Sequence, residues 1–254
     1  MSAAPPGLPS FFRLAPHERL PSTNDEAKAL AAAGAPAGTL VWARRQSAGR
    51  GRYGRSWVSL PGNLFASLIL RPEVRAAAAA QLGFAAALAA REASLGFAPD
   101  AAIAFKWPND VLLQSRKLAG ILLESEASSS GNLAWLVIGI GVNLASYPTD
   151  TPYPATALGV TGADVAPAAM LAAWARHFLR RYEEWDGGRG FAAQRVAWLG
   201  HAAGLGQGIR VRLAREELAG IFAGLDADGA LLLDAPSGRR RIEAGEVFPA
   251  ALVQ

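Results

Sequence analysis

Apolar residues in the first part of the chain follow two patterns, which predict a sheet packed against helices. Short apolar runs bounded by turn residues are typical of buried strands, whereas apolar positions three or four residues apart are typical of amphipathic helices. We predict strands over residues 39–43, 64–70, 103–106, 111–113, 121–125 and 133–143. We predict helices over residues 26–33, 76–95, 166–185 and 190–199, the first capped within residues 22–25 and the first two ended by Gly34 and Gly96.

From about residue 206 the pattern changes to short strand-like runs separated by the turn sequences ADG and PSG. Four or five strands in the remaining part of the chain predict a small β-barrel. We therefore expect an α+β fold in two domains. The first, residues 1–205, is a mixed β-sheet packed with helices, and the second, residues 206–254, is the barrel.

The composition excludes several classes of protein. Hydrophobic residues make up 51% of the 254 positions and charged residues 18%, which is enough apolar surface to exclude intrinsic disorder. The chain has no cysteine, which excludes a disulfide scaffold, a thiol nucleophile and an iron–sulfur site. The three histidines, His17, His177 and His201, are too far apart in sequence to predict a metal centre.

No segment is predicted to cross a membrane or to direct secretion. Residues 1–10 are proline-rich and lack the basic start and apolar run of a signal peptide. The alanine-rich stretch between Arg75 and Arg91 is too short to span a bilayer. We therefore expect a cytoplasmic protein with no membrane partner.

Positive charge is concentrated in one loop. The net charge is +4, yet residues 44–55 hold five arginines and no acid, so the rest of the chain carries a net charge of −1. Glycine and arginine alternate in GRGRYGR, residues 49–55, which suits the binding of an anion. A solvated basic loop, an RGG-like nucleic-acid segment and a mobile flap over a nucleotide phosphate all fit this pattern. The buried strands on either side and Trp57 favour the flap.

Two of the three lysines lie close together, beside a turn. Lys106 and Lys117 flank the Pro-Asn-Asp turn of KWPND, and a lysine suits a single developing anionic oxygen. The turn itself is explained by its residue types alone. In GIGVN, residues 139–143, glycines at alternate strand positions indicate the close approach of another group. Together these segments predict a site that binds an anion and activates it.

Taken in order, these segments resemble the biotin protein ligase family. The matching segments are STN (22–24), Q-x-x-GRGRYGRSW (46–57), PGNL (61–64), KWPND (106–110), RKLAGIL (116–122) and GIGVN (139–143). The GRGR and KWPND motifs are a highly specific pair, and residues 206–254 resemble the family's C-terminal SH3-like barrel. The resemblance implies a catalytic domain like those of class II aminoacyl-tRNA synthetases and biotin ligases.

The resemblance also implies a two-step reaction, that of a biotin–[acetyl-CoA-carboxylase] ligase. The family joins the biotin carboxylate to the α-phosphate of ATP, which gives biotinyl-5′-AMP and pyrophosphate. A lysine of a biotin carboxyl carrier protein then attacks the mixed anhydride. The implied ligands are biotin, ATP and Mg²⁺, with magnesium brought by ATP and Asp110 as the one protein group considered for it. The carboxylase that is modified, and whether the protein is a monomer or a homodimer, stay open.

Site residues follow from the resemblance by motif position. The implied catalytic residues are Lys117, which would hold the carboxylate or anhydride oxygens, and Arg52, which would close toward the phosphate. The implied biotin-binding residues are Ser22, Thr23, Asn24, Gln46, Arg50, Gly51, Arg52 and Lys117. The implied nucleotide-binding residues are Arg52, Arg55, Trp57, Lys106, Asn109, Asp110 and Asn143. No metal site made of protein groups alone is implied.

The sequence departs from the family pattern at two positions, and two other functions stay open. Asp25 stands where some relatives have glutamine, and Tyr53 where some have another arginine. Only 21 residues precede Ser22, so we expect a ligase without the winged helix-turn-helix domain of the repressor type. The alternatives are a lipoate or octanoate ligase-like acyltransferase of the same fold and an arginine-loop nucleic-acid binder. The net negative charge outside the loop argues against nucleic acid as a partner.

Overall fold

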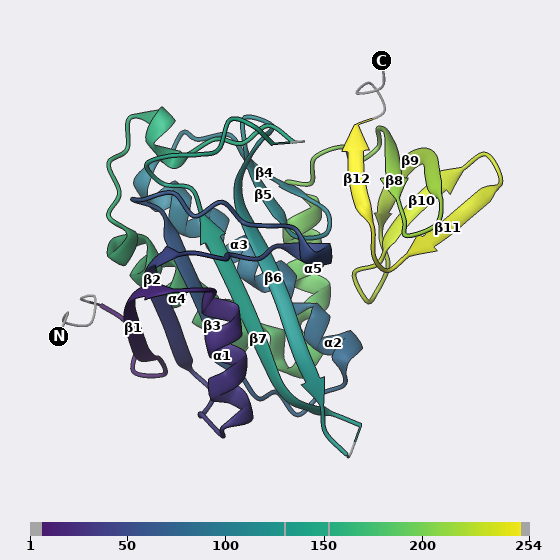
Figure 1. The fold of residues 1–254 in the computed structure, drawn as a ribbon. Coiled ribbons are helices and arrows are strands. Elements are labelled where there is room, and N and C mark those ends of the chain that lie inside the picture. The colour runs from purple at the N-terminus through teal and green to yellow at the C-terminus, as the bar shows by residue number, and fades with distance from the viewer. Residues whose placement is uncertain (1–6, 130, 152, 250–254) are drawn as a thin grey trace.

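The computed structural model describes residues 7–129, 131–151 and 153–249, which form two β-sheets with helices packed around the first (Figure 1). The larger sheet has seven strands in the order β1-β2-β3-β7-β6-β5-β4. Its strands are β1 (Arg13–Leu20), β2 (Thr39–Gln46), β3 (Leu64–Leu70), β4 (Ile103–Lys106), β5 (Asp110–Leu113), β6 (Arg116–Ala127) and β7 (Leu133–Val142). Only β1 and β2 pair in parallel, and the other neighbours are antiparallel.

Helices cover the two faces of this sheet unequally. Helix α1 (Thr23–Ala32) alone packs on one face, against β2, β3 and β7. On the opposite face lie α2 (Ala76–Ala80), α3 (Leu82–Phe97), α4 (Pro167–Trp185) and α5 (Phe191–Leu199), as Figure 1 shows. Short 3₁₀ turns are η1 (Arg52–Gly54), η2 (Leu158–Thr161) and η3 (Asp186–Gly188). The face of the sheet on which α1 packs is therefore only partly covered by helix.

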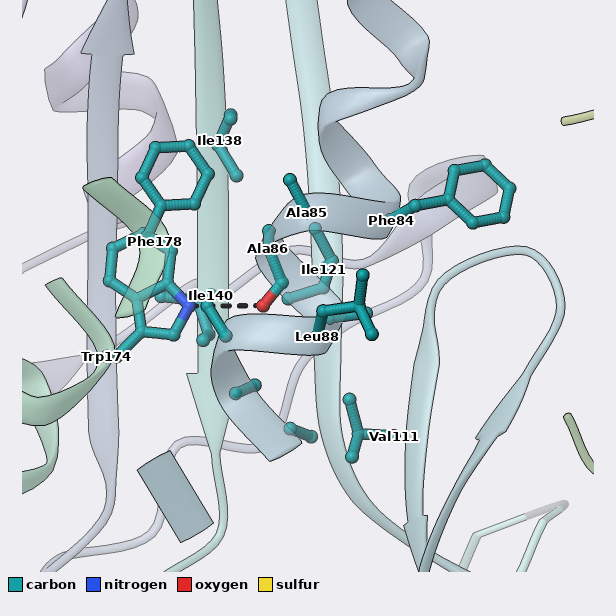
Figure 2. Packing of buried hydrophobic residues seen from close by; sticks show 14 of the residues in the cluster. Phe84, Ala85, Ala86, Leu88, Val111, Ile121, Ile138, Ile140, Trp174 and Phe178 are labelled. Carbon is teal, nitrogen blue, oxygen red and sulfur yellow. Dashed lines mark hydrogen bonds between the residues drawn. The ribbon is translucent and has the colours of Figure 1, made fainter. Parts of the chain in front are cut away.

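The main core lies between the sheet and α3 and α4 (Figure 2). Ile138 and Ile140 of β7 point into it from the sheet, and Trp174 and Phe178 point into it from α4. Small residues along α3 let α4 approach closely, and the indole Nε1 of Trp174 donates to the carbonyl oxygen of Ala86 at 3.2 Å. This dense layer holds β6 and β7 in place for the polar groups on their other face.

The smaller sheet has five antiparallel strands in the order β11-β10-β9-β8-β12. They are β8 (Gly208–Arg212), β9 (Glu217–Leu225), β10 (Leu231–Ala235), β11 (Gly238–Ile242) and β12 (Glu246–Pro249). The indole Nε1 of Trp107 donates to the carbonyl oxygen of Gly229 at 3.1 Å, and Arg195 donates to that of Leu225 at 3.2 Å. The small sheet is thus anchored to the residue that follows β4 and to α5.

Most of the predicted elements are present, with four differences. Residues 76–95 form two helices instead of one, because the chain turns at Gln81, whose side chain accepts a hydrogen bond from Trp185 Nε1 at 2.9 Å. Gly96 lies inside α3 and does not end it. Strand β6 begins before and ends after the predicted residues 121–125. Strand β1 was not predicted at all, since its sequence RLAPHERL has no apolar run.

The predicted domain boundary lies between α5 and β8, and residues 1–6 and 250–254 of the two predicted domains are outside the described residues. Among the helices that the structure describes, none has the length and apolar character needed to cross a membrane.

Candidate active site

A cavity of about 490 Å³ opens on the α1 face of the large sheet, next to the N-terminal end of α1. Its walls come from α1, β2, the loop between β2 and β3, the ends of β4 to β7 and the edge of the small sheet. All fourteen residues that sequence analysis assigned to a site line it: Ser22, Thr23, Asn24, Gln46, Arg50, Gly51, Arg52, Arg55, Trp57, Lys106, Asn109, Asp110, Lys117 and Asn143. The segments that carry the motifs therefore meet in one place.

At the α1 end of the cavity, neutral polar groups hold one another by hydrogen bonds. Ser22 caps the helix, since its Oγ accepts from the backbone N–H of Asp25 at 3.4 Å. Gln46 Oε1 accepts from both the backbone N–H and the hydroxyl of Thr23, at 2.8 and 3.1 Å. Ser67 Oγ lies 2.8 Å from Thr23 Oγ1 and 2.6 Å from Asn24 Oδ1. This end of the cavity is buried, hydrogen-bonded and without net charge.

The floor of the cavity is built on glycines that face each other across β6 and β7. Gly120 is the register partner of Gly141, and the indole of Trp57 lies over both, so close that a Cβ on Gly141 would be 2.6 Å from Trp57 Cε2. A Cβ on Gly139 would overlap Asn24 Oδ1. The glycines of GIGVN are thus required for close approach, as predicted. Trp57 Nε1 is buried and has no hydrogen-bond partner among the described residues, so it is available to a ligand.

At the opposite end, two lysines share one buried carboxylate. Lys117 Nζ lies 2.6 Å from Asp110 Oδ1, and Lys106 Nζ lies 3.2 Å from Asp110 Oδ2. Lys106 also lies 3.9 Å from the centre of the Tyr153 ring, within range of a cation–π contact. Two ammonium groups against one carboxylate leave this end of the cavity with a net positive charge.

The shared carboxylate explains how these charges tolerate burial. Burial alone raises the pKa of Asp110, but the charges of Lys117 and Lys106 outweigh it and hold that pKa below its ordinary value. Burial is also the main reason that the pKa of Lys106 is lowered, with Asp110 opposing the shift. Asp110 is therefore ionised at neutral pH, and its main partners are the two lysines.

The arginine-rich loop between β2 and β3 closes over the cavity and makes contacts at both of its sides. Arg50 forms ion pairs with Asp25 at 2.8 Å and with Glu124 at 2.7 Å, on the α1 side. Arg52 donates to the carbonyl oxygen of Gly245 at 3.3 Å, and Arg55 pairs with Glu246. The loop is thus held between the large sheet and the small one.

Asn109 and Asn143 line the cavity while their amide groups hold neighbouring backbone. Asn109 Nδ2 donates to the carbonyl oxygen of Ile121 at 2.6 Å, and Asn143 Nδ2 donates to that of Thr156 at 3.0 Å. Asn143 Oδ1 is buried and has no partner among the described residues. Each asparagine thus stabilises the shape of the wall, and Asn143 keeps one acceptor for a ligand.

Several residues of this site were missed by sequence analysis. Ser67 carried a signal, since it is the one polar residue in the apolar strand LFASLIL. Tyr153 lies in an irregular loop, and Arg212 and Phe248 belong to the small sheet, so no local pattern placed them at the cavity. Their position depends on how the two sheets pack.

The described residues offer no site for a metal ion made of protein groups alone. No group of three or more histidine, aspartate or glutamate side chains lies together in that part of the chain. Asp110 and Glu246 are the carboxylates in the cavity wall, and cationic side chains already pair with both. A divalent cation here would need its other ligands from a bound molecule.

Comparison with known proteins identifies the family. The biotin/lipoate A/B protein ligase family matches residues 17–143, and the biotin protein ligase C-terminal domain matches residues 204–248. A biotin--[acetyl-CoA-carboxylase] ligase of Paracoccus denitrificans is 48% identical over 91% of this chain and 98% of its own length. The chain belongs to the biotin protein ligase family. The bifunctional ligase/repressor BirA of Bacillus subtilis is 35% identical over 91% of this chain and 72% of its own length.

Solved structures agree with this assignment. The Aquifex aeolicus biotin protein ligase in complex with biotin and ATP has a TM-score of 0.78 and 27% identity, covering 92% of this chain and 97% of that chain. The Leishmania major biotin protein ligase in complex with biotinyl-5-AMP has a TM-score of 0.66 and 27% identity, covering 91% and 98%. The predicted family and fold, a helix-packed mixed sheet followed by a small antiparallel sheet, are therefore confirmed.

Proposed function

We propose that this chain is an ATP-dependent biotin protein ligase, which forms biotinyl-5′-AMP and transfers biotin to a lysine of a biotin carboxyl carrier protein. The observation that carries the proposal is one cavity with neutral hydrogen-bonding groups at one end and cations at the other. Biotin has the same division, with a neutral ureido ring, an apolar chain and a carboxylate. The ligases from Paracoccus denitrificans and Aquifex aeolicus support it.

The neutral end is proposed to bind the ureido ring. A ureido group has two N–H donors and one carbonyl acceptor, so it needs both kinds of partner in a buried site. Thr23, Asn24 and Gln46 offer hydroxyl and amide groups there, and Ser22 and the backbone of Gly51 complete this wall. Because unpaired buried polar groups are costly, a ligand without such a ring should bind this end poorly.

The cationic end is proposed to hold the reacting groups of the first step. A biotin carboxylate oxygen attacks the α-phosphorus of ATP, the bond to the bridging oxygen of the β-phosphate breaks, and pyrophosphate leaves with that electron pair. Two anions must come together, so positioning and charge neutralisation supply most of the catalysis. Lys117 would hold the carboxylate and then the anhydride oxygens, while Lys106, Arg52 and Arg55 would face the phosphates.

In the second step the amine of a carrier lysine attacks the acyl carbon of the anhydride. The bond from that carbon to the phosphate oxygen breaks, AMP leaves, and the amine loses a proton to water. The loop over the cavity must open far enough to admit the lysine. Arg52 and Trp57 belong to this loop, so they are proposed to protect the anhydride from water until the carrier arrives.

The proposal also covers the ion and the setting. Magnesium would enter with the triphosphate and supply charge neutralisation there, and Asp110, the carboxylate that both lysines contact, is the protein group that could assist. We place the reaction in the cytoplasm, with no nucleic-acid partner, and treat residues 1–205 and 206–254 as the catalytic and barrel domains.

Purified protein given biotin, Mg-ATP and an isolated carrier domain is expected to add one biotin to one lysine, as measured by intact mass and peptide mapping. The carrier with that lysine changed to arginine is the matched control. The same reaction with lipoate or octanoate tests the other acyl acids handled by relatives of this fold. Transfer of either acid at the rate of biotin, or no transfer of biotin to several carriers, would overturn the proposal.

A further inference from the structure

One acidic residue lies just outside the cavity and contacts both α1 and the arginine-rich loop. Residues at every second position of β6 share a face, and Gly120 and Leu122 on this face line the cavity. Glu124 is the next residue on it, with a side chain that is 25% exposed. None of the sequence motifs includes Glu124, and none of the proposed reaction steps involves it.

The carboxylate of Glu124 accepts from three side chains, two of α1 and one of the arginine-rich loop. Oε2 accepts from Asn24 Nδ2 of α1 at 2.9 Å. Oε1 accepts from Arg50 Nη2 of the arginine-rich loop at 2.7 Å and from Lys28 Nζ at 2.8 Å. Burial alone would raise the pKa of Glu124, but these donors hold it below its ordinary value, so the group is ionised at neutral pH.

The contact to Asn24 determines which way its amide faces. A carboxylate can only accept, so it must meet the NH₂ group of Asn24, and Oδ1 is then turned toward Ser67. Gly139 is required at this point because a Cβ there would overlap Oδ1. Glu124 and Asp25 together hold Arg50, where the loop begins to cross the cavity. One carboxylate thus orients an amide in the ureido-binding wall and holds the loop that covers it.

We propose that Glu124 is a positioning residue for biotin, which orients the Asn24 amide and couples it to the closed position of Arg50. This inference rests on the proposed function, since it concerns how the neutral end of the cavity binds biotin. It differs from a purely stabilising role, in which Lys28, Arg50 and Asn24 would be interchangeable partners. Lys28 does not line the cavity, so its ion pair with Glu124 can be removed separately.

The test uses three single variants of the full chain. E124Q keeps size and shape, but its NH₂ group would face the NH₂ group of Asn24 unless one amide turns over. K28M removes an ion pair from Glu124 and leaves the other two contacts in place. E126Q changes an exposed glutamate two residues further along the same face of β6. Each is assayed for the KM of biotin, the KM of ATP, kcat, the release rate of biotinyl-5′-AMP and the unfolding temperature.

For E124Q we expect the KM of biotin to rise roughly tenfold and the intermediate to leave roughly tenfold faster, as for loss of a hydrogen bond to a charged group. The KM of ATP and kcat at saturating biotin should stay within about threefold of the parent. K28M should lower the unfolding temperature but leave the KM of biotin within about twofold. E126Q should match the parent in every measurement.

Two results would overturn the inference while leaving the proposed function intact. One is an E124Q protein with parental KM for biotin and parental release of the intermediate. The other is a K28M protein with the same rise in KM as E124Q, which would show only a shared effect on stability. The double variant R50A/E124Q should release the intermediate faster than R50A, since E124Q also disturbs the Asn24 amide. The increase should be less than the product of the two single effects, because both changes break the contact between Arg50 and Glu124. If the parent itself transfers no biotin, the proposed function fails first.

Discussion

The two ends of the cavity hold their polar groups by different means. At the α1 end, Thr23, Asn24 and Ser67 are nearly inaccessible and satisfy one another through neutral hydrogen bonds. At the β5 end, Lys106 and Lys117 are held by the carboxylate of Asp110. Neutral groups fixed in this way can discriminate the shape of a ligand, because a ligand that fails to pair leaves them unsatisfied. The paired charges at the β5 end are already in position before the reaction begins, so no reorganisation is needed when charge develops in the transition state.

The two ends of the cavity should therefore respond differently to mutation. A change at the α1 end removes recognition, which both the bound substrate and the transition state use. It should therefore raise KM more than it lowers kcat. A change at the β5 end removes stabilisation of charge that develops in the reaction, so it should lower kcat. The apolar and glycine-rich floor between the ends should keep these effects separate.

The largest effect is expected from K117Q. The variant removes the ammonium group nearest to Asp110 and leaves a side chain of similar length. Loss of one charged group at the reacting oxygens costs about 2.7–4 kcal/mol, or roughly two to three orders of magnitude in the rate of adenylate formation. Pyrophosphate release at saturating biotin and ATP measures it. Unchanged release would refute the role of Lys117, and R116Q, on the adjacent exposed residue of β6, is the matched control.

G139A tests the opposite end and should have the next largest effect. The new methyl group would overlap Asn24 Oδ1, so the amide must leave its place beside Ser67. We expect the KM of biotin to rise by about tenfold or more while the KM of ATP is unchanged within about twofold. G96A is the control, since Gly96 lies in α3 with open space around it, and alanine there should slightly stabilise the helix. A G139A protein that loses ATP affinity equally would contradict the separation of the two ends.

Much of the large sheet was predictable because its strands carry their own signals. Residues 64–70 and 133–142 are apolar almost throughout, which is typical of strands buried on both faces, and β3 and β7 follow them closely. Strand β1 could not be found in this way. It lies at the edge of the sheet, carries polar residues and Pro16, and owes its place to parallel pairing with β2.

Site residues could be predicted from the sequence where the residue types of a motif indicate the local geometry. The glycines at 139 and 141 indicated close approach, and the structure gives the reason in Asn24 and Trp57. By contrast, Glu124 occurs in the strand sequence LLESE and shows nothing unusual there. Its contacts to residues 24 and 50 join segments far apart in the chain, so only the assembled sheet reveals them. Tertiary contacts of this kind leave no local periodic signal.

R52A should have a smaller effect than K117Q, because Arg52 lies on the loop that covers the cavity and is proposed to face the phosphates, whereas Lys117 is proposed to contact the reacting oxygens. Arg52 donates to the carbonyl oxygen of Gly245 at 3.3 Å, which joins the loop to the small sheet. We expect biotinyl-5′-AMP to escape about three- to tenfold faster, as for loss of one hydrogen bond, with adenylate formation reduced less than in K117Q. Trapping of labelled intermediate by gel filtration measures the escape. An intermediate held as tightly as in the parent would show that this contact does not keep the loop closed.

The smallest effect is expected for the pH dependence of the free energy of unfolding. This measurement distinguishes the two ends of the cavity without a bound substrate. The folded pKa of Asp110 lies below that of the unfolded side chain, about 3.9, mainly because Lys117 and Lys106 outweigh the cost of burial. Its contribution to stability is therefore complete above the unfolded pKa and is lost as the pH falls through the folded pKa. The neutral groups around Ser67 have no such dependence.

Accordingly, the free energy of unfolding of D110N should fall less steeply than that of the parent as the pH drops below about 4. D110N also leaves two ammonium groups without a carboxylate between them, so it should be less stable than the parent at neutral pH, and the gap should narrow in acid. Urea unfolding at a series of pH values measures both, with D100N, at an exposed turn before β4, as the control. Parallel curves for D110N and the parent would mean that Asp110 does not balance the cationic end. The tolerance of two partly buried lysines would then need another cause.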